Sequence, residues 1–246
     1  MLTDPMTLVF LDEARKLQYY KKVRRIFGSS LISYLPLGEQ AGSIAYDLSG
    51  NGLHGASVGV TLGEPGIGDG KTSYGFDGLA AYVNWYSAGL AAAFNGAEGT
   101  LMVWAKVANA GVWTDGAERR IVSLGTSGEG NVIYIRKQAG NNQLLVNRND
   151  DVTDKFVIVA ISQTTWFPVT ITWSVADDQV KVYVNGAQSG STQTGLSAFT
   201  GAIVNTRCNV GATTTVPAQV WFGNIQHVAL GNRALTPAEV AEVSTP

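Results

Sequence analysis

Cysteine is nearly absent from this sequence of 246 residues, and charged residues are few. Cys208 stands alone, which excludes an intrachain disulfide and a thiolate metal cluster, and we expect its side chain to be buried as an apolar filler. Only 15% of the residues are charged, with 17 Lys and Arg against 19 Asp and Glu. Nucleic-acid binding over a broad surface needs a basic excess, so we expect no nucleic-acid partner.

Long hydrophobic runs are also missing. No stretch reaches the roughly eighteen apolar residues that a membrane-spanning helix needs, so we expect no membrane span. Asp4, Asp12 and Glu13 interrupt the first thirty residues, which therefore lack the uninterrupted apolar stretch of a secretory signal. We expect synthesis in the cytoplasm of the producing cell without a signal peptide.

Glycine and hydrophobic residues are abundant. The chain has 29 glycines and a hydrophobic content of 45%, which favours a packed globule with many turns and argues against disorder. Its length is compatible with one β-sandwich around a single large core.

The first thirty residues have a helical pattern and a local basic excess. Thr3 can cap a helix and Gly28 can end it, and six Lys and Arg stand against three Asp and Glu in this stretch. We predict a basic amphipathic docking helix in residues 1–30 and a folded body in residues 31–246. The apolar positions that recur at intervals of three or four are Phe10, Ala14, Leu17, Tyr20, Val23 and Phe27.

Beyond residue 30 the hydrophobic period falls to two, which is typical of strands with one face in a core. The dipeptide Asn185-Gly186 predicts a tight hairpin, and Thr236 followed by Pro237 and Glu239 predicts a capped final helix, besides a short Ala-rich turn at 89–94. We therefore predict an all-β fold: a two-sheet antiparallel jelly-roll sandwich preceded by a short N-terminal helix. The expected strands lie at 74–76, 81–85, 101–107, 120–124, 132–136, 143–147, 156–161, 169–173, 179–184 and 219–230.

Several sequence blocks occur in a recognisable order between residues 31 and 244. They include LPLGEQAGSIAYDLSGNGLHG at 35–55, YGFDGLAAYV at 74–83, GTLMVWAK at 99–106, VKVYVNG at 180–186 and GNIQHVALGNRALTPAEVAEV at 223–243, with another at 166–173. The series resembles laminin-G-like domains of the concanavalin A-like lectin and glucanase superfamily, of the kind found in bacterial and phage structural proteins. That resemblance implies a concanavalin A-like sandwich but no particular ligand, because this fold hosts lectins, carbohydrate-binding modules, adhesion domains and glycanases.

The resemblance also implies a structural calcium ion in the loop that contains Asp47 and Asn51. Relatives commonly have an Asp-Glu pair after Gly-x-Ile, whereas here Gln226 and His227 follow Gly223-Asn224-Ile225. An amide and an imidazole are poorer calcium ligands than carboxylates. Two interpretations stay open: a calcium ion held by Asp47 and Asn51, and a plain Asx turn, which we favour.

Paired carboxylates of the kind that glycoside hydrolysis requires do not form a strand motif here. The aspartate pairs at 150–151 and 177–178 lie in turn-like segments. His54 and His227 have neither a nucleophile-elbow nor a zinc-type spacing, and we expect His54 to brace the loop after Asn51. We predict no catalytic residues and no enzymatic activity.

Glycan binding favours an exposed aromatic side chain beside amides and acids, because a sugar ring has an apolar face ringed by hydroxyls. Trp113 lies in the turn-rich segment 109–118 and is the best candidate for exposure. Polar residues 148–150 are predicted to line a concave face near it. The candidate ligand-binding residues are Trp113, Tyr86, Trp85, Arg148, Asn149 and Asp150.

Three interpretations of the basic helix compete: packing on its own domain, lying on a membrane surface, and docking to a larger assembly. Asp12 and Glu13 weaken the membrane interpretation, and an exposed apolar stripe would need a partner, so we favour docking. The residues predicted to make this assembly contact are Leu17, Tyr20, Lys21, Lys22, Val23, Arg24, Arg25 and Phe27.

A laminin-G-like domain behind a helical leader also resembles virion proteins of tailed phages, which leave the cell by lysis. Our first hypothesis is a non-catalytic virion structural protein, a capsid decoration or tail-associated subunit. Its partners would be other virion subunits or itself, and its sandwich would bind cell-surface glycan or protein. The alternatives are a freestanding carbohydrate-binding module or lectin and, less favoured, a glycanase.

Overall fold

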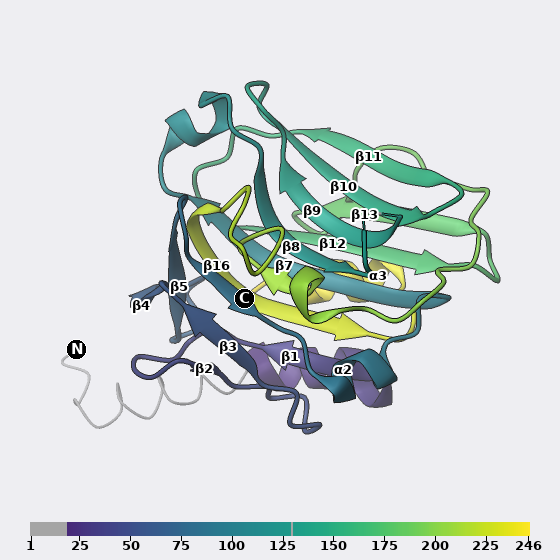
Figure 1. Ribbon diagram of the computed structural model, residues 1–246, viewed down its shortest axis with the longest axis horizontal. Helices are drawn as coiled ribbons and strands as arrows, with labels where there is room; N and C mark the ends of the chain where they lie inside the picture. The colour runs from purple at the N-terminus through teal and green to yellow at the C-terminus, as the bar shows by residue number, and fades with distance from the viewer. Residues whose placement is uncertain (1–18, 129) are drawn as a thin grey trace, which may run out of the picture.

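Two antiparallel sheets pack face to face in a sandwich, as the alternating pattern predicted (Figure 1). The computed structural model describes residues 19–128 and 130–246. Within them, sheet A has the strand order β14 (Ala187–Gln188), β13 (Gln179–Val184), β12 (Phe167–Ser174), β7 (Glu98–Val107), β16 (Phe222–Gly231), β5 (Thr72–Asp77) and β4 (Thr61–Pro65), and β1 (Leu31–Leu35) pairs with β16. Sheet B has the order β11 (Asp154–Ala160), β10 (Gln143–Asp150), β9 (Asn131–Lys137), β8 (Arg119–Gly125), β15 (Asn209–Val210), β6 (Tyr82–Asn84), β3 (Gly55–Val58) and β2 (Ile44–Ala45).

The helices of the described residues lie outside the two sheets. Residues 19–27 are helical and lead into a turn of 3-10 helix, η1 (Gly28–Ser30). The predicted capping box is present at the start of α3 (Pro237–Val243), and the Ala-rich turn forms α2 (Ala88–Ala93). In the part of the chain that the structure describes, no helix is long and apolar enough to cross a membrane. The remaining 3-10 turns are η2 (Ala110–Thr114) and η3 (Asn205–Arg207).

Side chains that alternate along the strands fill the space between the sheets. Leu101 and Val103 of β7 pack there with Trp173 of β12 and with Trp85, which follows β6. Cys208 is fully buried in the same core, as predicted, and burial raises the pKa of its thiol to about 12. The thiol therefore remains protonated at neutral pH and serves as an apolar filler.

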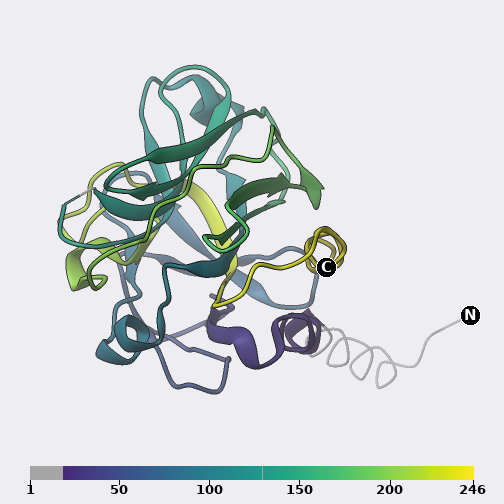
Figure 2. The same cartoon turned by 90° about the vertical axis from the view of Figure 1, so that its right-hand side faces the viewer.

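A second hydrophobic cluster lies on the outer face of sheet A, where helical residues 19–27 and α3 run side by side (Figure 2). Tyr19 packs against Trp104 of β7 with ring centroids 6.3 Å apart, and the Tyr19 hydroxyl donates a hydrogen bond of 2.7 Å to the Val243 carbonyl. Phe27 approaches β16 so closely that a Cβ on Gly231 would lie 2.6 Å from its ring. Sheet A is therefore covered on both faces along its middle strands.

This packing contradicts the exposed apolar stripe on which the docking prediction rested. Val23 and Phe27 are 0% and 1% exposed, and Tyr20 is half-buried. Leu17 lies outside the described residues. For residues 19–27, packing on the chain's own domain is the correct interpretation, because the sandwich itself supplies the apolar partner.

The basic side of the same helix stays at the surface. Lys21, Arg24 and Arg25 are exposed. Arg25 forms an ion pair with Glu242, and the half-buried Lys22 donates a hydrogen bond of 2.9 Å to the Thr245 carbonyl. These contacts attach the helix to the C-terminal end of the chain.

Strand β16 changes its pairing partner halfway along its length. Its first half pairs with β5 as far as Ile225, and its second half pairs with β1 from Val228 onward. His227 lies between the two halves with φ of 52°, its N–H donates to the Pro36 carbonyl, and the register with β7 shifts there. This bulge, with His227 in the left-handed region, lets β16 pair with β5 along its first half and with β1 along its second half.

The His227 ring fixes this bulge through buried polar contacts. Its Nδ1 lies 2.6 Å from the Tyr34 hydroxyl, and its Nε2 lies 3.0 Å from Asp69 Oδ2. The Tyr19 ring packs against the imidazole at a tilt of 57°, with centroids 4.5 Å apart. A neutral imidazole that donates to Asp69 and accepts from Tyr34 satisfies all three groups. Burial lowers the pKa of His227, which keeps the ring neutral despite the nearby Asp69 carboxylate.

The His227→Ala substitution is expected to destabilise the fold by about 3 kcal/mol, because it leaves Oδ2 of the buried Asp69 carboxylate without its donor. His54→Ala is the matched control, since His54 is exposed and accepts one hydrogen bond, from Asp47 N–H. Urea unfolding measures both. In the native protein, the free energy of unfolding should fall as the pH drops below about 6.5. At such a pH, His227 of the unfolded chain binds a proton, whereas the buried ring of the folded chain stays neutral because its pKa is lowered. Equal losses in the two variants, or a flat pH profile, would contradict this assignment.

Candidate functional site

A row of polar side chains crosses the outer face of sheet B. Asn147 pairs across strands with Tyr134, Tyr134 with Ser123, Ser123 with Asn209 and Asn209 with Asn84. Directly paired residues place their side chains on the same face of a sheet. These five residues are called the polar row.

Strand alternation places the polar row outside. Val146, Ile133 and Val210 point into the core, so the next residue of β10 and β9, and the preceding residue of β15, point outward. Strands lie roughly 4.8 Å apart, so the five strands from Asn147 to Asn84 span about 19 Å. The row has the length of an extended ligand that crosses the strands, but only Tyr134 and Asn84 among its members are more than 2% exposed.

Two amide oxygens in the row lack partners. Asn147 and Asn209 are only 2% and 0% exposed, and neither Oδ1 atom has a hydrogen-bond partner among the described residues. Asn209 uses its Nδ2 to donate to the Thr206 carbonyl. A buried polar atom without a partner is costly, so a donor that reached these oxygens would be stabilising, once the groups that cover them had moved aside.

Tyr134 provides an aromatic ring at the middle of the row. The Arg120 guanidinium lies 3.8 Å from the ring centroid, and that of Arg136 lies 5.5 Å away. Glu118 Oε2 accepts from Arg136 at 2.5 Å and from Gln219 at 2.6 Å. The charges beside Tyr134 are thus partly neutralised within the protein, and the half-buried ring is held in place.

The predicted aromatic candidates do not form an exposed platform. Trp113 is 1% exposed, and its indole N–H donates to the Gln163 carbonyl, so the prediction that it is exposed was wrong. Trp85 is fully buried and donates to Ser33 Oγ. Tyr86 is half-buried next to it. The turn-rich segment around Trp113 folds inward because it closes one end of the sandwich.

Residues 148–150 do not line a face near Trp113. The fully buried Arg148 and Asp150 form an ion pair of 2.8 Å that also holds the backbone of Ser197. Asn149 is half-buried at the same end of β10. Asn142, just before the opposite end of β10, donates its backbone N–H to the Trp113 carbonyl. About 20 Å of strand therefore separates Trp113 from Arg148. Arg148 and Asp150 therefore fasten a connection between the sheets.

Sequence reasoning missed every member of the polar row. The strands at 132–136, 143–147 and 120–124 were predicted, and Tyr134, Asn147 and Ser123 are their polar alternate positions. Reading those positions as one surface was possible only if the strand order was known. Asn209 and Asn84 join the row through β15, which no pattern predicted.

The loop predicted to hold calcium instead covers the free edge of β1. Asp47 Oδ1 accepts from the N–H groups of Tyr34 and Ser49, and Oδ2 accepts from Ser49 Oγ and Leu53 N–H. Asn51 turns its Nδ2 toward β1. No three His, Cys, Asp or Glu residues of the described chain gather as metal ligands. The Asp47 oxygens are occupied by protein donors, so this loop does not fit a calcium ion.

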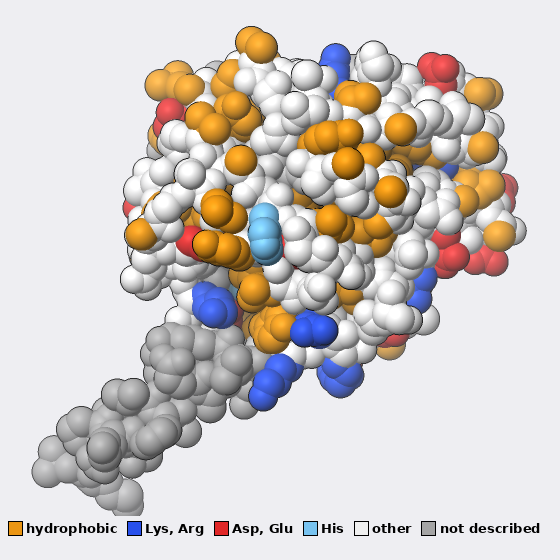
Figure 3. Space-filling model, turned by 60° about the horizontal axis from the view of Figure 1, so that its bottom comes forward, with side chains coloured by type: hydrophobic (Ala, Val, Ile, Leu, Met, Phe, Trp, Pro, Cys, Tyr) orange, Lys and Arg blue, Asp and Glu red, His pale blue; other side chains and the backbone are white. Residues whose placement is uncertain are grey.

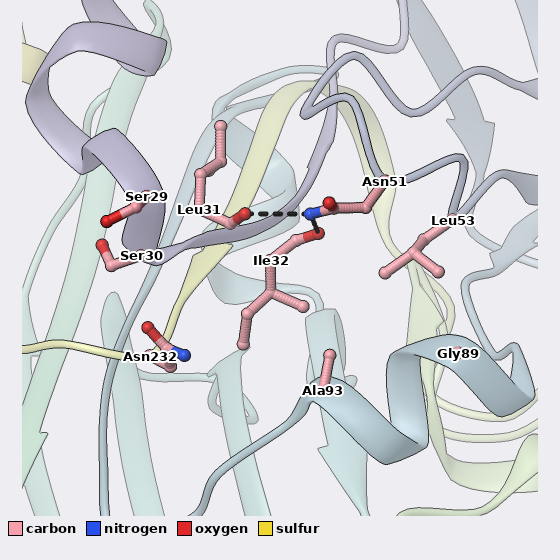
Figure 4. Close-up of a pocket in the computed structure, with 9 residues that line it drawn as sticks. All are labelled: Ser29, Ser30, Leu31, Ile32, Asn51, Leu53, Gly89, Ala93 and Asn232. Carbon is pink, nitrogen blue, oxygen red and sulfur yellow. Dashed lines mark hydrogen bonds between the residues drawn. The ribbon is translucent and has the colours of Figure 1, made fainter.

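A pocket of about 440 Å³ lies beside this loop, between β1 and α2 (Figure 4). Asn51 reaches into its wall and donates to the carbonyls of Leu31 and Ile32 at 3.1 Å and 2.8 Å. Ser30 Oγ donates to the Phe27 carbonyl. These polar groups already have partners in the protein, unlike the amide oxygens of the polar row, so the row is the stronger candidate site.

The sandwich and its outer polar row define a lectin-like binding fold. The chain belongs to the concanavalin A-like lectin/glucanases superfamily, whose family model matches residues 67–241. The predicted resemblance is therefore confirmed. No curated protein matches the sequence.

Solved structures with this fold include both binding domains and parts of enzymes. Trypanosoma rangeli sialidase in complex with sialic acid is 14% identical with a TM-score of 0.66, over 96% of this chain and 38% of that one. The binding domain of botulinum neurotoxin serotype D is 16% identical with a TM-score of 0.62, over 87% and 51%. This chain thus spans about two fifths to one half of those proteins.

A third similar structure matches over nearly its whole length. It is domain 4 of an extracellular arabinanase from Geobacillus stearothermophilus in complex with arabinotriose. It is 17% identical with a TM-score of 0.64, over 88% of this chain and 98% of that one. At such identities these likenesses establish the fold.

Calcium and a chelator should leave the melting temperature of the protein unchanged, because the Asp47 carboxylate already accepts hydrogen bonds from the backbone and from Ser49. Asp47→Ala should lower stability by about 2–3 kcal/mol in either buffer, since buried N–H groups lose their acceptor. Differential scanning calorimetry with and without calcium measures both effects. A calcium-dependent rise that Asp47→Asn abolishes would restore the metal interpretation.

Proposed function

We propose that this chain is a non-catalytic lectin-like module that binds an oligosaccharide along the polar row. The single observation that carries the proposal is the pair of buried, unpartnered amide oxygens of Asn147 and Asn209 on either side of Tyr134. Sugar hydroxyls are donors that these oxygens can accept from. The face of the Tyr134 ring that Arg120 leaves uncovered can pack against the apolar C–H face of a sugar ring.

The length and the charge of the row support an oligosaccharide. A span of about 19 Å exceeds one sugar ring and suits several linked sugars across the strands. The five side chains of the row are uncharged, which favours a neutral glycan over a strongly acidic one. The arabinanase domain in complex with arabinotriose is a precedent for glycan binding by a module of this fold and size.

The chemistry of the row favours binding over hydrolysis. Glycoside hydrolysis uses two carboxyl groups that flank the scissile bond, and no member of the polar row has one. The nearby Glu118 carboxylate accepts hydrogen bonds from Arg136 and Gln219. Paired in this way, it is poorly suited to act as a general acid.

Asn147→Ala and Tyr134→Ala should each weaken oligosaccharide binding at least about tenfold, equivalent to about 1.4 kcal/mol. Asn147→Ala should barely change stability, because its Oδ1 has no partner within the described protein. Tyr46→Ala is the control, since Tyr46 is a tyrosine 47% exposed outside the row. A glycan array selects the ligand, and calorimetric titration measures the affinities.

Unchanged affinity in both row variants, or equal loss in the Tyr46 control, would contradict the proposed site. Failure of the native protein to bind any glycan would contradict the function. Incubation of the protein with the selected oligosaccharide should release no reducing ends, and their release would make the chain a glycanase.

We further propose that the module is displayed on a bacteriophage virion, as a capsid decoration or tail-associated protein held by its N-terminal segment. The observation that favours attachment is the exposed basic side of the helix, Lys21, Arg24 and Arg25. In Figure 3, several Lys and Arg side chains gather in the lower part of the described surface. With the apolar side of residues 19–27 already buried, attachment through the described helix would be electrostatic, to an acidic surface of another virion subunit.

The double variant Lys21→Glu with Arg24→Glu should lose its place in particles while keeping its fold and its glycan affinity, because the reversed charges would repel an acidic subunit. Lys106→Glu with Lys181→Glu makes the same change in net charge on β7 and β13 and is the control. Quantification of the chain in density-purified particles checks this. Equal incorporation of both variants, or absence of the native chain from particles, would contradict virion attachment.

A further inference from the structure

Sheet edges invite pairing with another strand, and most edges of this sandwich are protected. The free side of β1 is covered by Asp47, Leu48 and Asn51, which bond to its backbone. Strands β2 and β14 have only two residues each. Strand β4 ends in Glu64 and Pro65, a charge and a residue without N–H.

Strand β11 is less protected, because its charged residues, Asp154 and Lys155, stand only at its start. It has seven residues, forms the end of sheet B and carries no proline. Phe156 and Ile158 are 43% and 44% exposed on its outer face, and Val152 just before it is 77% exposed. These are three of the eight large hydrophobic side chains found exposed among the described residues. The edge is therefore both open and apolar.

The hydrogen bonds to β10 fix which backbone groups face outward. Ile161 N–H donates to the Asn142 carbonyl, and the Thr153 carbonyl accepts from Asp150 N–H. In this register the odd-numbered residues of β11 bond to β10, so the even-numbered ones turn their N–H and C=O groups to the open edge. The even-numbered residues at 154, 156, 158 and 160 are all exposed.

The strand is complementary to itself about Val157. In an antiparallel pair of two β11 strands centred there, Phe156 of one copy lies opposite Ile158 of the other, and Asp154 lies opposite Ala160. These are the residues with free N–H and C=O groups, so each pair can form two hydrogen bonds. Four large apolar side chains meet on one face, and no like charges lie opposite each other.

We propose that two copies of this chain associate through their β11 edges into a twofold symmetric dimer, which joins the two sheets B into one continuous sheet. The interface is isologous, because the same strand serves both partners. Asn147 of each polar row pairs directly with Phe156, so the two rows end on either side of the dimer axis, two residues out of register. Such a dimer presents two ligand rows to one surface and gains avidity. The association itself does not depend on glycan binding.

The test compares two matched isoleucines at the two ends of sheet B in the full-length chain. Ile158 and Ile44 are both 44% exposed, but only Ile158 lies on β11. Sedimentation velocity should give a dimer of about twice 26.0 kDa for the native chain and for Ile44→Lys. Ile158→Lys should be monomeric, because the lysine would face Phe156 of the other copy.

A second variant leaves the pairing with β10 intact. Ile158→Pro removes an N–H that faces the open edge, so it should abolish the dimer while the monomer keeps its fold. Hydrogen exchange on the native chain gives an independent measurement, with the amides of Phe156 and Ile158 protected more strongly as protein concentration rises. The proposal would be overturned if the native chain is a monomer or if both Ile158 variants still form the dimer. It would also be overturned if hydrogen exchange at these amides does not change with protein concentration.

Discussion

Sheet A depends on the change of partner along β16. A straight strand could not pair with both β5 and β1, and the left-handed turn at His227 shifts the second half toward β1. The imidazole ring holds that turn by joining Tyr34 of β1 to Asp69 of the loop between β4 and β5. Tyr19 then packs on the ring, so the N-terminal helix is positioned by the same residue. One buried side chain thereby connects the edge of the sheet, its central strand and the helix that covers them.

The strands that the sequence revealed are those whose two faces differ. Alternation located β9, β10 and β13, and the Asn185-Gly186 turn, with φ of 54° and 79°, predicted the hairpin between β13 and β14. The capping box of α3 was equally local. Strand β1 escaped notice because its sequence, LISYL, does not alternate regularly between apolar and polar residues, and β2 and β15 are too short for any period. Local patterns thus predicted the sandwich but not its complete strand order.

The site was harder to predict because it depends on register between distant strands. Trp113 looked exposed in a turn-rich segment, yet its indole seals the end of the core against Phe167. Asp47 resembled a metal ligand, yet its neighbours offer N–H groups instead of leaving its oxygens to a cation. Nothing near Val23 in the sequence revealed that sheet A would cover the apolar side of the helix. For Trp113 and Val23 the deciding partner lies far along the chain, whereas the partners of Asp47 lie within 13 residues of it.

The two outer faces of the sandwich have different occupants. Helical residues 19–27 and α3 cover sheet A, and the C-terminal residues lie beside Lys22. The polar row lies on the opposite side, on sheet B. The described helix and the C-terminal residues therefore lie on one side of the sandwich, and the polar row lies on the other. Any body fused or attached there would stand behind the module, and the polar row would point away from it.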